Sequence, residues 1–283
     1  MAYILYHADC YDGFGAAWAY WTGRAEIPRD TYIPCKYGQP MPDIPDHEQV
    51  YILDFSYPED ALRSLAKRSL SVTLLDHHKT AEKDLQGFLT RPEANLNITF
   101  DMAHSGAYLA WDEFCGGDVP QLIQYIEDRD LWTNKLPHIE EITAWLRSYE
   151  RTFENFDILH DGLNHRENRY EVIAQGSAIL RFQRQKVQEI CDAGTRMLEV
   201  GGYTVPVVNV PYIFASDVGH ELLQRWPQYK FAAYYFDRSD GIRQWGLRSR
   251  KDFDCSVVAK ANGGGGHAQA SGFQEATPDA HAY

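Results

Sequence analysis

The sequence has no long apolar run and comparatively little positive charge. Its 283 residues include 27 Lys and Arg against 40 Asp and Glu, which gives a formal net charge of −13. A membrane span needs roughly 20 consecutive apolar residues, so we expect no membrane association. Binding of long nucleic acid relies on many Lys and Arg contacts to phosphates. Any polyanionic substrate should therefore be short, or be met by metal ions.

Cysteine is also scarce, and its pattern excludes two common kinds of site. The five cysteines are an odd number, are widely scattered and contain no Cys-x-x-Cys pair: Cys10, Cys35, Cys115, Cys191 and Cys255. This argues against a structural zinc site and against a redox pair, and it favours a reducing, cytoplasmic compartment. The first six residues are apolar but lack a basic leader, so we expect no signal peptide.

The first half of the chain alternates short apolar runs with helical segments. Residues 3–6, 49–53 and 71–75 read as buried strands, and residues 15–21, 58–69, 105–115 and 120–127 read as helices. This alternation predicts an α/β fold with a mainly parallel sheet flanked by helices.

A long helical pattern divides the chain. Ile173, Leu180 and Val187 recur at heptad spacing within residues 164–192. Beyond it, residues 203–210, 230–236 and 244–248 read as strands, and residues 216–226 as a helix. We therefore predict a catalytic domain over residues 1–163, a connector helix over 164–194, and a smaller α/β substrate-binding domain over 195–283.

Acidic and imidazole side chains follow all three strands predicted in the first half. The residues concerned are His7, Asp9, Asp12, Asp54 and His77. The carboxyl ends of parallel strands share one edge of a sheet, where open α/β sheets place their ligands. Carboxylates gathered there repel one another unless cations neutralise them. The pattern therefore predicts a divalent metal site, although an Asp at a strand end is also a common helix cap and Asp54 could cap the helix after Pro58.

Four motifs resemble those of the DHH phosphoesterase superfamily, which includes RecJ exonucleases, nano-RNases, cyclic-dinucleotide phosphodiesterases and family II pyrophosphatases. The resemblance covers nearly the whole chain. The motifs run in the expected order: residues 7–13 (His-Ala-Asp-Cys-Tyr-Asp-Gly), Asp54, residues 76–78 (Asp-His-His) and residues 126–132 (Ile-Glu-Asp-Arg-Asp-Leu-Trp). In many members a single position separates the two Asp residues of the first motif, whereas two positions separate Asp9 from Asp12.

The resemblance implies two divalent ions, bridged by Asp54. One would be bound by His7, Asp9 and Asp54, and the other by Asp12, Asp54, His77 and Asp128. Asp130 is the alternative to Asp128 in the fourth motif. Oxygen ligands with a few imidazoles suit manganese first, with magnesium or cobalt as substitutes.

Two residues of the third motif receive catalytic roles from the same resemblance. His78 would contact the phosphoryl oxygens or assist the leaving group. Asp76 would orient the metal-bound His77, as bound imidazoles usually require.

A glycine run near the C-terminus resembles the DHH-associated C-terminal domain. Residues 263–267 read Gly-Gly-Gly-Gly-His, and residues 270–272 read Ala-Ser-Gly. Successive glycines let a backbone approach a phosphate closely, although such a run is often only a flexible linker. The substrate-binding residues predicted on this basis are Arg248, Gly264, Gly265, Gly266, His267 and Ser271.

The leading interpretation is a metal-dependent phosphodiesterase that hydrolyses nano-RNA or dinucleotides to nucleoside 5'-monophosphates. Cyclic mononucleotides, cyclic dinucleotides and 3'-phosphoadenosine 5'-phosphate are alternative substrates. A non-catalytic nucleotide-binding protein is the alternative from another class, but no expected ligand position is empty. The resemblance permits a homodimer.

Overall fold

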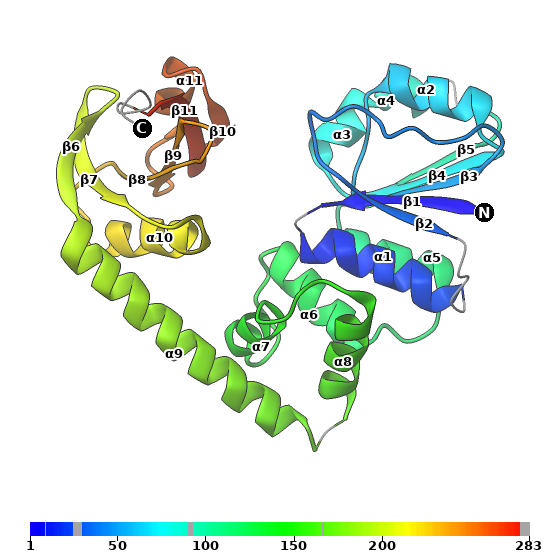
Figure 1. The fold of residues 1–283 in the computed structure, drawn as a ribbon, viewed down its shortest axis with the longest axis horizontal. Coiled ribbons are helices and arrows are strands. Elements are labelled where there is room, and N and C mark those ends of the chain that lie inside the picture. The colour runs from blue at the N-terminus through cyan, green and yellow to red at the C-terminus, as the bar shows by residue number, and fades with distance from the viewer. Residues whose placement is uncertain (9, 25–29, 90–92, 166, 278–283) are drawn as a thin grey trace. The chain divides into compact units, whose positions relative to one another are not determined.

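The computed structural model describes the chain except for residues 9, 25–29, 90–92, 166 and 278–283 (Figure 1). It divides into two compact units, Met1–Leu180 and Arg181–Tyr283. Each unit has its own sheet and its own hydrophobic clusters. None of the helices in the described part of the chain combines the length and the apolarity that a membrane span requires.

The N-terminal unit is built on a parallel sheet with the strand order β2-β1-β3-β4-β5. Its strands are β1 (Ala2–His7), β2 (Thr31–Cys35), β3 (Gln49–Leu53), β4 (Ser71–Asp76) and β5 (Leu96–Phe100). The three strands predicted from apolar runs are the three central ones. Central parallel strands are buried on both faces and therefore read as continuous apolar runs.

Helices cover both faces of this sheet (Figure 1). On one face lie α1 (Tyr11–Gly23) and α5 (Gly106–Phe114), and on the other lie α2 (Glu59–Arg68), α3 (Lys79–Asp84) and α4 (Gln86–Leu89). Successive side chains of β1 point to opposite faces. Ile4 packs in the cluster of α1 and α5, and Leu5 packs in the cluster of α2.

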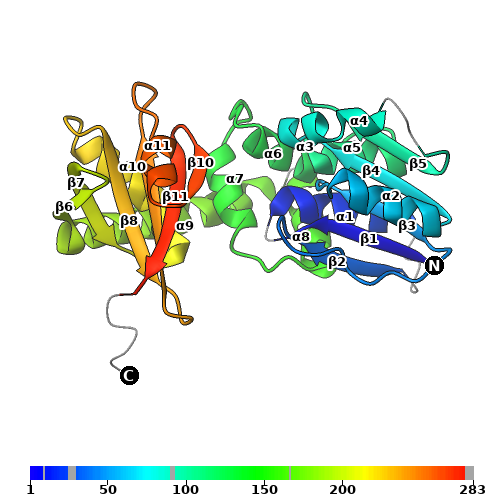
Figure 2. The same ribbon diagram turned by 90° about the horizontal axis from the view of Figure 1, so that it is seen from above.

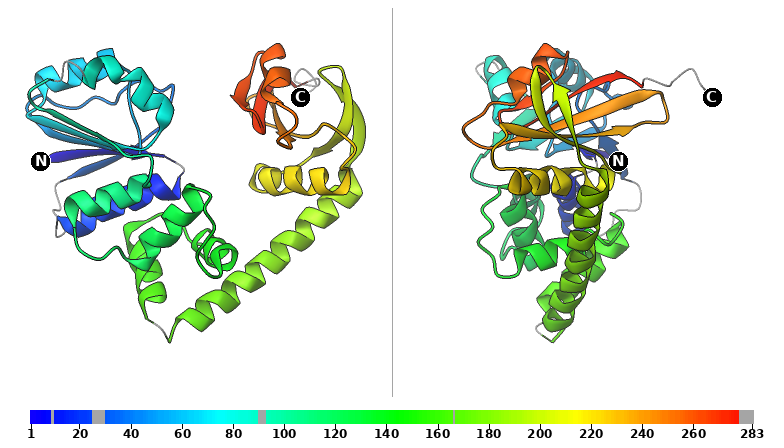
Figure 3. Two further views of the ribbon diagram at one scale, coloured as in Figure 1. Left: turned by 180° about the vertical axis from the view of Figure 1, so that it is seen from behind. Right: turned by 90° about the vertical axis from the view of Figure 1, so that its left-hand side faces the viewer.

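A helical layer follows, made of α6 (Gln121–Asp130), α7 (Ile139–Leu146) and α8 (Phe153–Asn164). Its core residues include Ile126, Trp145 and Phe156, and they form one cluster with Trp18 of α1. The next helix, α9 (Arg169–Gly194), is continuous (Figure 3). Its Val172 belongs to this same core.

The C-terminal unit holds a six-stranded mixed sheet in the order β10-β11-β9-β8-β7-β6, in which only the pair β7 and β8 is parallel (Figure 2). The strands are β6 (Arg196–Val200), β7 (Tyr203–Asn209), β8 (Phe231–Asp237), β9 (Ile242–Ser249), β10 (Gly265–His267) and β11 (Ala270–Ala276). The helical elements are η1 (Tyr212–Phe214), α10 (Ala215–Arg225) and α11 (Ser256–Ala261). Val207 and Val208 point into separate clusters on the two faces of the sheet.

The predicted fold class is confirmed: a parallel sheet flanked by helices, followed by a second α/β unit. Strands β2, β5, β6 and β11 were not predicted, and one further detail differs from the expectation. The long helix was expected from residue 164, but Asn164 ends α8 and α9 begins at Arg169. The glycine run is not a flexible linker, because Gly265–His267 forms the edge strand β10.

Candidate metal centre

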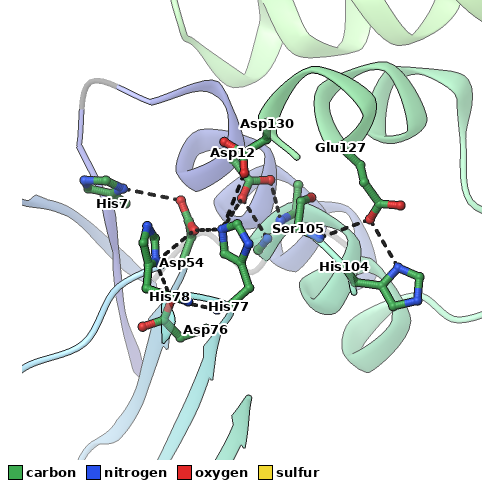
Figure 4. Close-up of polar contacts among 12 residues, drawn as sticks. His7, Asp12, Asp54, Asp76, His77, His78, His104, Ser105, Glu127 and Asp130 are labelled. Atoms are coloured by element: carbon green, nitrogen blue, oxygen red, sulfur yellow. Dashed lines mark hydrogen bonds and ion pairs between the residues drawn. The ribbon is translucent and has the colours of Figure 1, made fainter. Parts of the chain in front are cut away.

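Those predicted site residues of the first three motifs that the structure describes lie at the carboxyl edge of the parallel sheet (Figure 4). His7 ends β1, Asp54 directly follows β3, and His77 and His78 directly follow β4. The parallel register places these strand ends side by side. Asp9 lies outside the described residues.

Asp54 is the centre of the cluster and is almost completely buried, with 1% of its surface exposed. Its backbone has a φ of +54°, a left-handed conformation that few residues other than glycine adopt. Its oxygens lie 3.5 Å from His7 Nδ1 and 3.1 Å from His77 Nε2. The carboxylate therefore faces two imidazoles, which favours the ligand interpretation of Asp54 over the cap interpretation.

Two groups of potential metal ligands share Asp54. One consists of His7, Asp54 and His78, and the other of Asp12, Asp54 and His77. In each group the ligand atoms lie within 4.8 Å of one another. Each group therefore has the dimensions of a cation site.

The amino terminus of α5 holds Asp12. Its carboxylate is buried, lies 3.4 Å from His77 Nε2 and accepts hydrogen bonds from the amides of Gly106 (2.7 Å) and Ala107 (2.9 Å). A helix amino terminus stabilises negative charge. A side chain at Gly106 would collide with Asp54, because its Cβ would lie 2.4 Å from Asp54 Cβ. The glycine therefore lets α5 approach both carboxylates.

Asp76 supports the third motif, although not in the way predicted. Its buried carboxylate accepts hydrogen bonds from Ser56 Oγ and from the His77 amide (2.7 Å), and it lies 2.6 Å from His78 Nδ1. The ring that it orients is therefore that of His78, and for His77 it fixes only the backbone. Because of the bond to Asp76, the pKa of His78 is raised, although burial opposes this rise.

The fourth motif contributes Asp130 to the cluster, whereas Asp128 was the predicted ligand. Asp130 Oδ2 lies 3.5 Å from His77 Nε2. The carboxylate of Asp128 instead accepts hydrogen bonds from the amides of Lys135 (2.9 Å) and Leu136 (3.0 Å) and from the Thr133 hydroxyl. The geometry therefore favours Asp130 as the ligand, and Asp128 organises the loop after α6.

The electrostatics show that the cluster carries excess negative charge. Burial raises the pKa of Asp12, and the charges of Asp54 and Asp130 raise it further. Burial and the charge of Asp54 likewise raise the pKa of Asp130. Burial alone would lower the pKa of His77, but Asp54, Asp12 and Asp130 outweigh it and raise this pKa to about 9. In the absence of metal, an imidazolium is thus the main counter-charge.

The cluster fits a divalent cation. His7 Nδ1 and Asp54 Oδ1 are buried, and neither has a hydrogen bond of regular geometry within the described part of the chain. Buried polar atoms left without partners are costly. Imidazole nitrogens and carboxylate oxygens suit manganese or magnesium. In the metal-free protein, burial and the charges of Asp54 and Asp12 raise the pKa of the neighbouring Cys10 thiol to about 12.

Tyr37 is a neighbour of the cluster that the sequence reasoning missed. Its half-exposed ring packs edge-on against His7 at 5.5 Å and His78 at 5.9 Å between ring centroids, and it lies 4.6 Å from the ring of Phe55. Tyr37 follows β2, a strand absent from the prediction. Recognition of β2 as a strand would have pointed to Tyr37, because the carboxyl end of β2 lies at the same edge of the sheet as the cluster.

His104 lies apart from this cluster. Its Nδ1 is 3.3 Å from Glu127 (Figure 4), and its ring stacks on Tyr108 with 3.7 Å between centroids. The Glu127 carboxylate also accepts a hydrogen bond from the Ser105 amide. These contacts give His104 a structural role at the start of α5.

The C-terminal unit contains a cavity of about 560 Å³ that four of the predicted substrate-binding residues line: Arg248, Gly265, Gly266 and Ser271. Aromatic side chains form much of the remaining wall: Tyr212, Tyr234, Phe236 and Trp245. Gly264 and His267 do not line it. A Cβ at Gly264 would lie 2.0 Å from the Gly272 carbonyl oxygen, so strand packing accounts for this glycine, and the side chain of His267 is exposed.

No protein-family model matches the sequence. An uncharacterized protein of Acanthamoeba polyphaga mimivirus is 30% identical in an alignment 293 positions long. The alignment covers 95% of this chain and 66% of the viral protein. The chain thus spans about two-thirds of that relative's length.

Two solved structures are similar across 99% of this chain. The pGpG-specific phosphodiesterase PggH from Vibrio cholerae has a TM-score of 0.52 at 14% identity, with 94% of its chain covered. RecJ from Thermus thermophilus, in complex with Mn²⁺, has a TM-score of 0.51 at 15% identity, with 50% covered. RecJ is among the members of the DHH superfamily named above. The shared fold is therefore the one that the motifs predict.

Proposed function

We propose that this protein is a metal-dependent phosphodiesterase of the DHH type, which hydrolyses short oligonucleotides or dinucleotides to nucleoside 5'-monophosphates. The observation that carries this proposal is the buried carboxylate of Asp54, which two groups of potential metal ligands share. A carboxylate shared by two groups of potential ligands suits a pair of closely spaced ions, which is how two-metal phosphoester hydrolysis works.

The proposed cofactors are two divalent ions, with manganese preferred and magnesium or cobalt as substitutes. His7, Asp9 and Asp54 would hold one ion. His78, the third member of the group of potential ligands that contains His7 and Asp54, would be engaged by Asp76 instead. Asp12, Asp54, His77 and Asp130 would hold the other, with Asp130 in place of Asp128. When bound, such a pair lowers the pKa of a shared water and neutralises charge on the phosphoryl oxygens.

His78 is the proposed proton-handling residue of the chain itself. Its Nδ1 lies 2.6 Å from the buried carboxylate of Asp76, which favours a proton on that nitrogen. The ring is therefore held in one orientation, with Nε2 available to a phosphoryl oxygen or to the leaving alcohol. A positioned imidazole with a raised pKa can donate a proton to a departing oxygen.

The C-terminal cavity is the proposed binding site for the substrate's second phosphate or nucleoside. About 560 Å³ is within the usual range for small-ligand pockets. Arg248 can donate charge-assisted hydrogen bonds to a phosphate, and the glycines of β10 leave their backbone accessible. The similarity to a phosphodiesterase specific for pGpG, a linear dinucleotide, supports a substrate of this length.

Other small substrates remain within the same chemistry: cyclic mononucleotides, cyclic dinucleotides and 3'-phosphoadenosine 5'-phosphate. Long nucleic acid is disfavoured by the net charge of −13. A cytoplasmic location and a homodimer stay predictions from the sequence.

The decisive experiment is release of mononucleotides from a 5'-labelled RNA dinucleotide and a five-nucleotide RNA, with manganese or with chelator. We expect manganese-dependent cleavage by the wild type and its loss in His77→Ala. The matched control is His47→Ala, because His47 is exposed and precedes β3 at the opposite edge of the sheet. Cleavage that survives in His77→Ala, or its absence in manganese-loaded wild type, would refute the proposal.

A further inference from the structure

Trp132 is an exposed indole two positions after Asp130, a proposed metal ligand. All seven tryptophans lie in the described part of the chain, and Trp132, which is 65% exposed, is the only one that is largely exposed. It is separated by one residue from Asp130, whose carboxylate lies 3.5 Å from His77. An exposed indole forgoes the favourable free energy of burial, so its exposure two positions after a proposed ligand calls for a reason.

The backbone holds this indole in an unfavourable conformation. Trp132 has a φ of +55° and Asn134 a φ of +46°, both in the left-handed region. For a bulky residue such a conformation is energetically unfavourable and persists only where its surroundings enforce it. Strain of this kind clusters at ligand-binding sites.

Asp128 holds the backbone of Trp132 and Asn134 in this conformation. Its carboxylate accepts from the amides of Lys135 and Leu136, and its carbonyl oxygen accepts from the amides of Thr133 (3.1 Å) and Asn134 (3.3 Å). One residue thus fixes the whole turn that presents Trp132. The turn is therefore ordered by hydrogen bonds to a single residue.

Arg129 fixes the ring as well. Its guanidinium lies 4.3 Å from the indole centroid, and it donates to the Asn134 side chain at 3.3 Å. A guanidinium stacked on an indole stabilises the ring orientation. Since the indole stays 65% exposed, a large part of the ring remains open to a second planar group.

We propose that Trp132 is a stacking platform for a nucleobase of the nucleotide whose phosphate is bound at the metal centre. This inference rests on the proposed function and adds a base-binding element to the N-terminal unit. Every base has a flat π-face, so stacking on an indole is tolerant of base identity. The platform therefore gives affinity for nucleotides without selecting a sequence.

The test removes the indole and the base separately and together. Wild type, Trp132→Ala and Trp132→Phe are assayed with manganese on an RNA dinucleotide and on two analogues, each abasic at one position. In the wild type, loss of the stacking base should raise KM about tenfold or more. In Trp132→Ala, the KM for the dinucleotide should rise by a similar factor, and loss of that base should have no further effect. Trp132→Phe should lie between the two.

Tyr170→Ala is the matched control, because Tyr170 is an aromatic residue of the same unit with 83% exposure. It should behave as the wild type with all three substrates. Equal effects of base removal in the wild type and in Trp132→Ala would overturn the platform, because the indole and the base would then act independently.

A binding measurement separates this inference from the proposed activity. The fluorescence of 2-aminopurine nucleoside 5'-monophosphate, titrated in magnesium, should be quenched by the wild type and by Tyr170→Ala but not by Trp132→Ala. Quenching that depends on Trp132 in a protein without hydrolytic activity would uphold the platform and refute the function. Hydrolytic activity together with quenching that is unchanged in Trp132→Ala would uphold the function and refute the platform. A dimer that dissociates in Trp132→Ala, with nucleotide binding unaltered, would also overturn the platform.

Discussion

At the scale of single residues, Asp128 and Asp130 show how two neighbouring carboxylates of one helix acquire different tasks. Each residue of an α-helix turns by about 100°, so side chains two positions apart point in nearly opposite directions. Asp130 faces His77 and Asp128 faces the following loop. The sequence motif contains both residues, and only the direction in which each side chain points from α6 identifies Asp130 as the candidate ligand.

Substitution of these two residues by asparagine should therefore give opposite results. Asp130→Asn should lower manganese affinity by at least about tenfold and should stabilise the metal-free protein, because it removes a charge that burial and Asp54 disfavour. Asp128→Asn should destabilise the protein by about 1–3 kcal/mol, because it weakens charge-assisted hydrogen bonds to the loop. Calorimetric manganese titration and urea unfolding measure the two effects.

Asp118→Asn is the control for this pair, since Asp118 is an exposed carboxylate between α5 and α6. It should leave both quantities unchanged. Manganese affinity that falls in Asp128→Asn and not in Asp130→Asn would restore Asp128 as the ligand.

Tyr37 illustrates what residue patterns leave out. The strand before it contains Pro34, and proline in a short run argues against a central strand. The structure places β2 at an edge of the sheet, where proline is tolerated. Because the strand was not predicted, its carboxyl end and the tyrosine beyond it could not be assigned to the site.

At the scale of elements, the approach of α5 to the sheet is what assembles the acidic cluster. The amides of Gly106 and Ala107 bind Asp12, and the missing side chain of Gly106 makes room for Asp54. An alanine here would ordinarily favour a helix by roughly 0.5–1 kcal/mol. The geometry reverses that expectation.

Gly106→Ala should destabilise the protein by about 1–3 kcal/mol, the usual cost of overpacking, and should also lower manganese affinity, because Asp54 must move. Gly87→Ala in α4 is the comparison: the atom nearest to its Cβ is a carboxylate oxygen of Glu59 at 3.1 Å, the end of a flexible side chain. Its effect should stay within about 0.5 kcal/mol. Urea unfolding with and without manganese would test both variants, and a neutral Gly106→Ala would contradict the packing argument.

The elements that were predictable from the sequence share a physical signature. Strands β1, β3 and β4 are central and largely buried, so each is a short run dominated by apolar residues. The edge strand β5 alternates buried and exposed residues, and β10 consists of two glycines and a histidine. Edge strands depend on pairing with a neighbour rather than on their own composition, so their sequences carry a weaker signal.

At the scale of the whole molecule, α9 is more than a connector. A Cβ at Gly176 would lie 2.0 Å from the Glu141 carbonyl oxygen, which shows close packing of the first half of α9 against α7. Val187 and Cys191 in its second half pack in the cluster of α10. The division between the units accordingly lies within the helix, after Leu180. A heptad pattern predicts the helix but does not show which neighbour covers each half.

Metal and pH should act together on the stability of the whole protein. The pKa of His77 is raised from 6.5 to about 9, so the stabilisation from its imidazolium is complete below pH 6.5 and is lost as the pH rises through 9. The raised pKa values of Asp12 and Asp130 act in the same direction, since their charged forms are disfavoured in the folded state. The metal-free protein should therefore become less stable as the pH rises from 6.5 to 9.

A divalent ion needs neutral His77 and ionised carboxylates, so it competes with protons and binds more tightly at higher pH. Manganese at 100 times its Kd should stabilise the folded state by ~2.7 kcal/mol, and at a fixed concentration the gain should grow from pH 6.5 to 8.5. Thermal unfolding with manganese or with chelator at these two pH values measures the gain. In His77→Ala the gain should be smaller and less dependent on pH, because the proton that competes is gone. A gain of equal size at both pH values in the wild type would mean that the ion does not replace the His77 proton, and would place the metal away from this cluster.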